Sequence, residues 1–225
     1  MNKNYLSLIY GFLLGESYIF KNPSYSSKKG AAIRREGVCK EIKLIIKIEG
    51  KHISYMRDIH TKISNLGYCE QKFPKIIRKL RKKGKLNKLM LLHTYNNNNY
   101  LELYNKWYVD KLHKNIPYDI GSHFNEESLA YLLMTEGKIK NRKLYLNMTQ
   151  FNNRDIKIIK QFLEKKFKLD QINLNNNCLE FNANNILKIY NITKPYILPS
   201  MKFKFITAFN LPSEGMDHYG GKMNY

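Results

Sequence analysis

The chain has 225 residues, of which 43% are hydrophobic, and this is enough for a core in one domain or two compact halves. Lys and Arg number 39 against 18 Asp and Glu, so the formal net charge is +21, and an excess of this size indicates an anionic partner, most often nucleic acid. Interleaved basic and aromatic residues argue against a solubilising tail or a membrane-surface protein. No cysteine or histidine spacing predicts a disulfide framework or a zinc site.

The chain opens with the apolar stretch YLSLIYGFLLGESY, residues 5–18. This stretch is shorter than the roughly 18 apolar residues that a membrane-spanning helix needs. It also lacks the small-residue pattern of a signal-peptide cleavage site. We therefore expect a core helix over residues 5–15, which contains Gly11 and Gly15 and is followed by Glu16.

The rest of the first half alternates strands and helices. The pattern predicts strands over 18–20, 30–35 and 41–49, a helix over 52–66, strands over 68–80 and 86–95, and a helix over 100–112. In the strand over 41–49, period-two alternation places Lys43, Ile45 and Lys47 on one face and four apolar residues on the other.

The second half repeats this order of elements. The pattern predicts a helix over 126–134, a strand pair over 138–149, a helix over 153–167, strands over 169–174 and 178–182, and a helix over 184–194. Each half reads as αββαββα, which indicates an internal repeat. We therefore divide the chain into a first repeat at 1–114, a polar linker at 115–124, and a second repeat with a C-terminal tail at 125–225.

Both first helices end in an acid followed by a small residue, in FLLGES and in AYLLMTEGK. The C-terminal end of a helix disfavours negative charge, so Glu16 and Glu136 require compensation, which a bound divalent cation supplies. Two carboxylates brought together by the repeat form an oxygen-rich site suited to Mg²⁺ and to metal-assisted cleavage of phosphodiesters. The residues alone leave open the alternative of two unrelated surface acids.

The stretch LIYGFLLGES resembles the signature helix of the LAGLIDADG homing endonuclease and maturase family, with Gly11 and Gly15 at the small positions that let two helices cross closely. SLAYLLMTEG resembles the second copy of that helix, with Ala130 at the first small position. HKNIPYDI and KPYILPSMKFKF resemble segments of the single-chain, omega-type, mitochondrial intron-encoded subgroup. The resemblance implies an α+β fold in which two pseudo-symmetric αββαββα halves form a saddle of antiparallel sheets in the major groove of a duplex.

The resemblance also implies a reaction and the residues that carry it. A homing endonuclease of this family makes a double-strand DNA break by hydrolysing one phosphodiester in each strand. Glu16 and Glu136 would then bind Mg²⁺, and Lys114 and Lys204 would polarise the water or the phosphate. The family further implies a mitochondrial, organelle-encoded monomer with internal pseudo-two-fold symmetry and no membrane partner.

Two departures from the family pattern keep a second function open. Both metal-binding positions carry Glu, where Asp is usual in this subgroup, and Thr135 stands where a further acid is common. A member that keeps the fold and the charge without cleavage binds structured RNA and needs no cofactor. It would act as an intron maturase or as a component of a mitochondrial ribosome or other ribonucleoprotein.

Basic residues outside the acidic centre are expected to contact phosphates. Residues 78–88 contain seven basic side chains around the turn RKKGK, more than a merely solvated turn needs. The complete set of candidates is Lys43, Lys47, Arg78, Lys79, Arg81, Lys82, Lys83, Lys85, Lys138, Lys140, Arg142 and Lys143.

Overall fold

The computed structural model of the protein describes residues 1–23, 39–49, 52–80, 86–110 and 113–205. The elements of the first half are α1 (Lys3–Leu14), β1 (Tyr18–Pro23), β2 (Cys39–Glu49), α2 (Ile53–Asn65), β3 (Ile76–Leu80), β4 (Leu86–His93) and α3 (Asn99–Trp107). A short helix, α4 (Ile120–His123), leads to the second half. Its elements are α5 (Glu126–Glu136), β5 (Gly137–Lys140), β6 (Lys143–Asn147), α6 (Asn153–Phe167), β7 (Asn173–Asn175), β8 (Cys178–Phe181), α7 (Ala183–Thr193) and the 3-10 turns η2 (Lys194–Tyr196) and η3 (Pro199–Met201).

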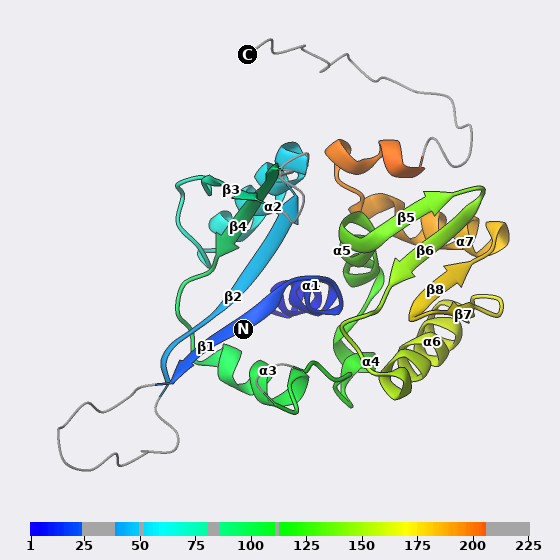
Figure 1. The fold of residues 1–225 in the computed structure, drawn as a ribbon, viewed down its shortest axis with the longest axis horizontal. Helices are drawn as coiled ribbons and strands as arrows, with labels where there is room; N and C mark the ends of the chain where they lie inside the picture. Colours follow the sequence, from blue (N-terminus) through cyan, green and yellow to red (C-terminus); the bar gives the residue numbers. More distant parts are fainter. Residues whose placement is uncertain (24–38, 50–51, 81–85, 111–112, 206–225) are drawn as a thin grey trace, which may run out of the picture.

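Two antiparallel sheets flank the central helices α1 and α5, which pack side by side (Figure 1). The strand order is β1-β2-β4-β3 in the first sheet and β5-β6-β8-β7 in the second, so both halves have the same topology. One continuous hydrophobic core joins the two halves. The duplicated α+β fold expected from the sequence is confirmed. In the described part of the chain, no helix is long and apolar enough to cross a membrane.

Asparagine side chains fix where several helices begin. The side chain of Asn2 accepts the Asn4 N–H at the start of α1, and Asn152 and Asn182 accept an N–H three residues further on in α6 and α7. Asn125 forms a capping box with Ser128 at the start of α5. Each bond satisfies a backbone donor that has no partner inside its helix, so these sequence positions set the helix starts.

The strands of both sheets divide their side chains between a core face and an open face. In β2, Ile42, Leu44, Ile46 and Ile48 are buried, and Lys43 and Lys47 lie on the opposite face, as the alternation predicts. The β5–β6 turn holds Asn141 and Arg142 at φ 52° and 55°, the backbone that a tight two-residue hairpin needs. We call the side of the first sheet that carries Lys43 and Lys47 its open face, and the open face of the second sheet is the side that carries Lys138, Lys140 and Lys143.

The crossing of α1 and α5 is close at Gly11. A Cβ added to Gly11 would lie 2.4 Å from the carbonyl oxygen and 3.0 Å from the Cα of Ser128. Both atoms belong to the backbone of the opposite helix, so they cannot turn aside as a side chain would. Ala130 is fully buried in α5. Only glycine at position 11 allows this approach, which is how the two halves come together.

Replacing Gly11 by Ala is therefore expected to push the two central helices apart. Overpacking of this kind costs about 1–3 kcal/mol, and we expect a loss at the upper end of that range because the contact is with backbone. Thermal or urea unfolding of the purified variant measures the change. Gly121→Ala is the matched control, since a Cβ at Gly121 has only one ordinary contact, at 3.8 Å from Phe162. Equal melting temperatures for Gly11→Ala and wild type would contradict the close crossing.

Three predicted elements differ from the observed ones. Of the strand expected over 68–80, only Ile76–Leu80 is a strand, because Tyr68 stacks flat on Tyr5 of α1, with ring centroids 3.7 Å apart, and the chain packs irregularly there. The helix expected over 100–112 ends at Trp107, where Tyr108 becomes extended and forms a β-bridge with Lys114. The strand expected over 169–174 is instead Asn173–Asn175. The strand expected over 30–35 lies outside the described residues.

The segment after α7 connects the second half back to the first. The Leu198 N–H donates to Met134 Sδ, 3.3 Å away, at the end of α5. The Ser200 hydroxyl donates to Asp58 Oδ2, at 2.7 Å, on α2 of the first half. Ile197, Met201 and Phe205 are buried in the common core. This segment therefore holds the end of α5 against both halves.

Candidate active site

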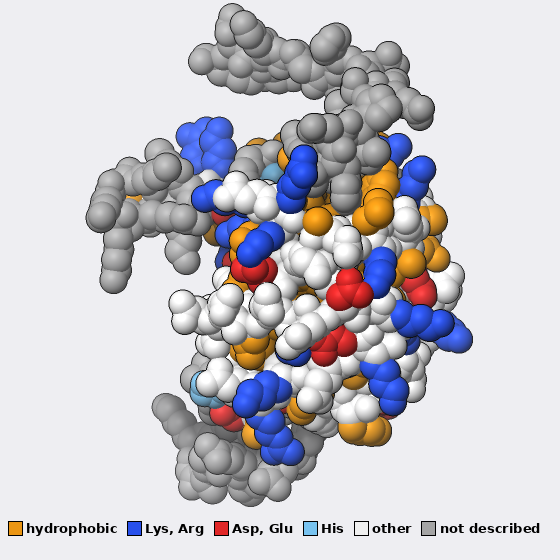
Figure 2. All heavy atoms as spheres, turned by 90° about the vertical axis from the view of Figure 1, so that its right-hand side faces the viewer, with side chains coloured by type: hydrophobic (Ala, Val, Ile, Leu, Met, Phe, Trp, Pro, Cys, Tyr) orange, Lys and Arg blue, Asp and Glu red, His pale blue; other side chains and the backbone are white. Residues whose placement is uncertain are grey.

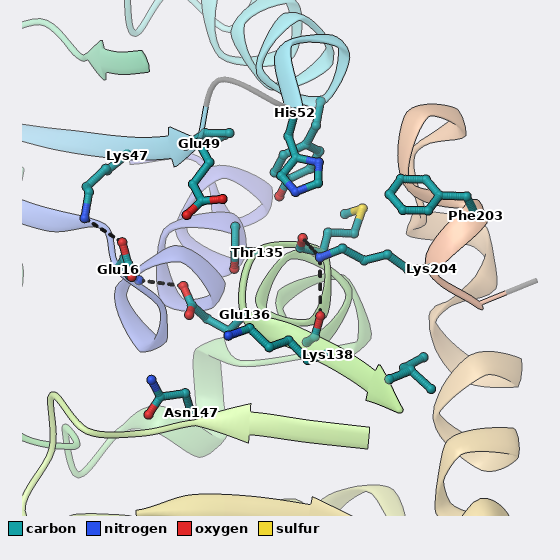
Figure 3. Close-up of a pocket in the computed structure, with 15 residues that line it drawn as sticks. Glu16, Lys47, Glu49, His52, Thr135, Glu136, Lys138, Asn147, Phe203 and Lys204 are labelled. Carbon is teal, nitrogen blue, oxygen red and sulfur yellow. Dashed lines mark hydrogen bonds and ion pairs between the residues drawn. The ribbon is translucent and has the colours of Figure 1, made fainter. Parts of the chain in front are cut away.

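Two carboxylates lie side by side where α1 and α5 end (Figure 3). The Glu16 N–H donates to Glu136 Oε1 at 3.0 Å, so the backbone of the first half orients the acid of the second. Gly15 leaves room for this arrangement, since a Cβ there would lie 3.0 Å from the same Oε1 and 3.2 Å from Thr135 Oγ1. The structure thus brings together the two acids that the repeat predicts.

The two acids differ in environment. The Glu16 side chain is 60% exposed, whereas Glu136 is half-buried, and this burial raises the pKa of the Glu136 carboxyl. Burial penalises the charged form of Glu136, while the Glu16 N–H and the charges of Lys114 and Lys204 favour it. A divalent cation held between the two carboxylates would favour it further, and the donor set of carboxylate oxygens suits Mg²⁺.

Lys47 of β2 is a third member of this centre. Its Nζ lies 2.6 Å from Glu16 Oε2, and Figure 3 shows it reaching Glu16 from the first sheet. The register of the two sheets shows that the corresponding position in the second sheet is Asn147. Tyr18 pairs with Ile45 in the first sheet, and Lys138 pairs with Tyr145 in the second. Lys47 lies two residues after Ile45, and Asn147 lies two residues after Tyr145. The acidic centre is therefore unequal on its two sides, with a lysine beside Glu16 and an amide in the corresponding place beside Glu136.

A hollow of about 490 Å³ opens next to the two acids. Figure 3 shows its wall, to which both sheets and the segment after α7 contribute. Its lining includes Glu16, Lys47, Glu49, His52, Thr135, Glu136, Lys138, Asn147, Phe203 and Lys204. Among the described residues no three His, Cys, Asp or Glu gather as a metal cluster. Glu16 and Glu136 would supply two carboxylates to a bound cation, which would complete its coordination with water or with oxygens of a ligand.

Lys114 lies beneath the centre and not in the hollow. It is 7% exposed, and its Nζ donates to the carbonyl oxygens of Leu13, Gly15 and Ser17 at 2.8, 2.9 and 2.6 Å and to Gln150 Oε1 at 3.0 Å. Burial lowers the pKa of Lys114 to about 7. The ammonium group thus satisfies carbonyls at the end of α1 and fixes the turn that carries Glu16.

Lys204 has the corresponding place in the second half. Its Nζ donates to the carbonyl oxygen of Met134 at 2.6 Å and to that of Gly137 at 3.3 Å. Lys204 is only partly buried and lines the hollow, unlike Lys114. Each lysine therefore holds the end of one central helix, but Lys204 alone of the two also faces the space beside the acids.

The basic residues selected from the sequence do not all share one surface. Lys138, Lys140 and Lys143 are exposed on the open face of the second sheet, where Lys143 pairs with Glu180 at 2.6 Å. Lys43 and Lys47 lie on the open face of the first sheet, and Arg142 is exposed in the β5–β6 turn. Arg78 is exposed on the other face of the first sheet, since its neighbour two residues back, Ile76, pairs with buried Met90. The side chain of Lys79 and the residues Arg81, Lys82, Lys83 and Lys85 lie outside the described part.

Sequence reasoning missed the residues that orient the acids. Gln150 donates to the Leu14 carbonyl oxygen at 2.6 Å and accepts from Lys114. Lys47 was expected to contact phosphate, and the structure places it on Glu16. The spacing between acid and strand differs between the halves, 31 residues from Glu16 to Lys47 and 11 from Glu136 to Asn147, so the correspondence becomes visible only in the register of the sheets.

The duplicated topology, the close helix crossing and the paired carboxylates define a two-sheet, pseudo-two-fold α+β protein with an acidic centre. The chain matches the profile of the LAGLIDADG DNA endonuclease family over residues 6–182, and it belongs to this family.

Two curated relatives carry the name cytochrome b mRNA maturase bI2. The protein of Saccharomyces cerevisiae is 26% identical over 217 residues, covering 91% of this chain and 48% of that protein. The protein of Debaryomyces hansenii is 26% identical over 209 residues, covering 91% and 74%. The chain thus spans about half the length of the first relative.

A solved structure with the same fold is that of the homing endonuclease I-WcaI bound to its DNA recognition sequence. The TM-score is 0.74 at 23% sequence identity, and the match covers 91% of this chain and 86% of that chain. It has the fold described above, with two antiparallel sheets around a pair of central helices.

Proposed function

We propose that the protein is a homing endonuclease that makes a metal-dependent double-strand break in DNA. The observation that carries this proposal is the pair of carboxylates, Glu16 and Glu136, joined at the crossing of α1 and α5 between two sheets with lysines on their open faces. A duplex lying on those faces places its phosphates beside the acids. The name of the solved neighbour, an endonuclease bound to its DNA, supports the same reading.

Glu16 and Glu136 would hold Mg²⁺ in this reaction. The bound ion would stabilise negative charge on the phosphate and lower the pKa of a water. Lys47 holds the Glu16 side chain in place through their ion pair, and Lys114 and Lys204 hold the helix ends from which the two acids project. Of the two lysines expected to polarise water or phosphate, Lys204 lines the hollow and is the better placed.

The test is a cleavage assay with the purified chain. The substrate is DNA of the mitochondrial locus that encodes the chain, with the intron removed, so that an insertion site is restored. With Mg²⁺ we expect a discrete double-strand cut, and with EDTA intact DNA that is still bound. A cut of equal rate in EDTA would exclude the metal site, and no cut with tight binding would exclude the endonuclease.

A second function, binding of structured RNA as an intron maturase, is favoured by one observation. The alignments with the two bI2 maturases cover 91% of this chain, and so include both repeats and the segment after α7. The same relatives support a mitochondrial location. Binding of an RNA transcribed from the same locus, together with no DNA cleavage in the assay above, would select this function. The division into repeats at 1–114 and 125–225, joined by a linker at 115–124, stays part of the proposal.

A further inference from the structure

Helix α6 carries a straight row of basic residues on its outer surface. Arg154, Lys157, Lys165 and Lys168 are all exposed, and with Gln161 they follow one another at spacings of three or four residues. These spacings put Arg154, Lys157, Gln161 and Lys165 on one stripe of the helix, and Lys168 follows as its C-cap. At 1.5 Å per residue the stripe from Arg154 to Lys165 is about 17 Å long. We call these four basic residues the α6 row.

No acid balances the row. Glu164 is occupied by Lys160, at 3.0 Å, and by the Ile172 N–H, at 2.7 Å, and Asp155 is buried at the helix start, where it accepts from Asn152. None of the four residues of the row has an ion-pair partner among the residues that the structure describes. Like charges at this spacing weaken a helix, and Arg154 stands in the first turn, where a cation is unfavourable. Lys165, in the last turn, is favourably placed, so helix stability accounts for only part of the row.

The first half provides an internal comparison. Helix α2 follows the first strand pair of its half as α6 does, and it has the same exposed stripe with the same spacings. The residues of that stripe are Ser54, Arg57, Thr61 and Asn65, where α6 has Arg154, Lys157, Gln161 and Lys165. The stripe of α2 thus has one basic residue at these positions, and the stripe of α6 has three. The basic composition of the chain as a whole therefore does not explain the row.

The row also lies away from the proposed DNA-binding surface. Ile156, Ile159 and Leu163, on the inner side of α6, are buried in the core, which is also where the second sheet buries Leu144 and Leu146. The open face of that sheet is on the other side of these strands. Figure 2 looks onto the side where α6 and α7 lie in Figure 1 and shows basic side chains spread across it. A duplex on the open faces leaves the row uncovered.

We propose that the α6 row is a second nucleic-acid site, which binds the phosphate backbone of a structured RNA while the open faces remain available for DNA. A row of point charges without base-reading groups suits recognition of RNA by shape and backbone. Its length covers several consecutive phosphates, which supply the favourable charge that the protein itself does not. This inference rests on the RNA-binding function proposed above.

The experiment compares two triple variants of the full chain. One carries Arg154→Gln, Lys157→Gln and Lys165→Gln, and leaves Lys168 in place because it ends the helix at φ 50°. The other carries Lys138→Gln, Lys140→Gln and Lys143→Gln on the open face. The probes are an RNA transcribed from the locus that encodes the chain and a DNA duplex of the same sequence. Binding is measured from low to moderate salt.

For the row variant we expect RNA affinity to fall roughly tenfold or more near 0.1 M salt, and the slope of log affinity against log salt to decrease by about 2. Its DNA affinity is expected to stay within about twofold of wild type, and the open-face variant is expected to show the reverse. Arg57→Gln and the ion-paired Lys160→Gln serve as controls with little effect on either probe.

Two results would overturn the inference in different ways. If the row variant binds RNA like wild type and the open-face variant does not, RNA uses the open faces, and the RNA-binding function survives without the row. If wild type shows no affinity for the RNA at all, both the row and the RNA-binding function are wrong. Equal losses on RNA and DNA in the row variant would also exclude a separate surface.

Discussion

Glu136→Gln is expected to reduce DNA cleavage by roughly 10³-fold while DNA binding is retained. The amide has the size of the carboxylate and keeps an oxygen that accepts the Glu16 N–H, but it lacks the charge that holds a divalent cation. Burial raises the pKa of Glu136, so the charged form is penalised in the folded protein. The neutral variant is therefore expected to unfold at no lower temperature than wild type, which separates loss of chemistry from loss of fold.

Glu16→Gln is expected to give the same loss of cleavage, since it removes the other carboxylate. It also frees Lys47 from its ion pair, so DNA binding is expected to rise slightly. The matched control is Glu126→Gln, which changes an exposed acid in the first turn of the same helix as Glu136. Cleavage at the wild-type rate by either active-site variant would remove the acids from the mechanism.

Lys114→Met is expected to have the largest effect on stability, about 3 kcal/mol or more. Methionine fills much of the volume but donates no hydrogen bond, so the carbonyl oxygens of Leu13, Gly15 and Ser17 lose their common donor in a buried place. Urea unfolding measures the loss. Lys204→Met, with two carbonyl partners and partial exposure, is expected to cost less than half as much.

The same pair of variants tests the role of each lysine. A positioning role for Lys114 predicts that cleavage and stability fall together and that Lys114→Arg, which can still donate, restores part of both. If a lysine acts only on the water or the phosphate, its replacement by Met is expected to reduce cleavage and to leave stability unchanged. We expect the first result for Lys114 and a larger share of the second for Lys204, because only Lys204 lines the hollow.

The sequence was sufficient to predict the duplicated fold and that Glu16 and Glu136 lie close together. Helices α1 and α5 are visible in the sequence as apolar runs followed by or ending in an acid. In β2, apolar and polar residues alternate in the sequence, and buried and less buried side chains alternate in the same way in the structure. The strand predicted over residues 68–75 was wrong, because residues there make individual contacts, such as Tyr68 stacked on Tyr5, and do not pair as a sheet. Periodicity describes regular elements and carries no information about such irregular packing.

The surroundings of the acids could not be predicted, because they depend on distances between residues far apart in the sequence. Lys114 reaches carbonyls about 100 residues away, and Lys47 reaches an acid 31 residues away. A lysine in a sequence is normally predicted to be exposed. Whether it is instead buried as a hydrogen-bond donor depends on which helix end packs against it in the fold. The contact of Gly11 with the backbone of Ser128 could likewise not be predicted, because a backbone contact does not require a particular residue type at position 128.

The hydrogen bond between Ser200 and Asp58 joins positions 142 residues apart. During synthesis the first half emerges long before its neighbour at Ser200 exists, and loop closure over such a distance is slow. Until then, the part of the core that Ile197, Met201 and Phe205 cover in the folded protein stays open. A chain that ends before residue 194 is therefore expected to expose apolar surface and to aggregate more readily than the full chain.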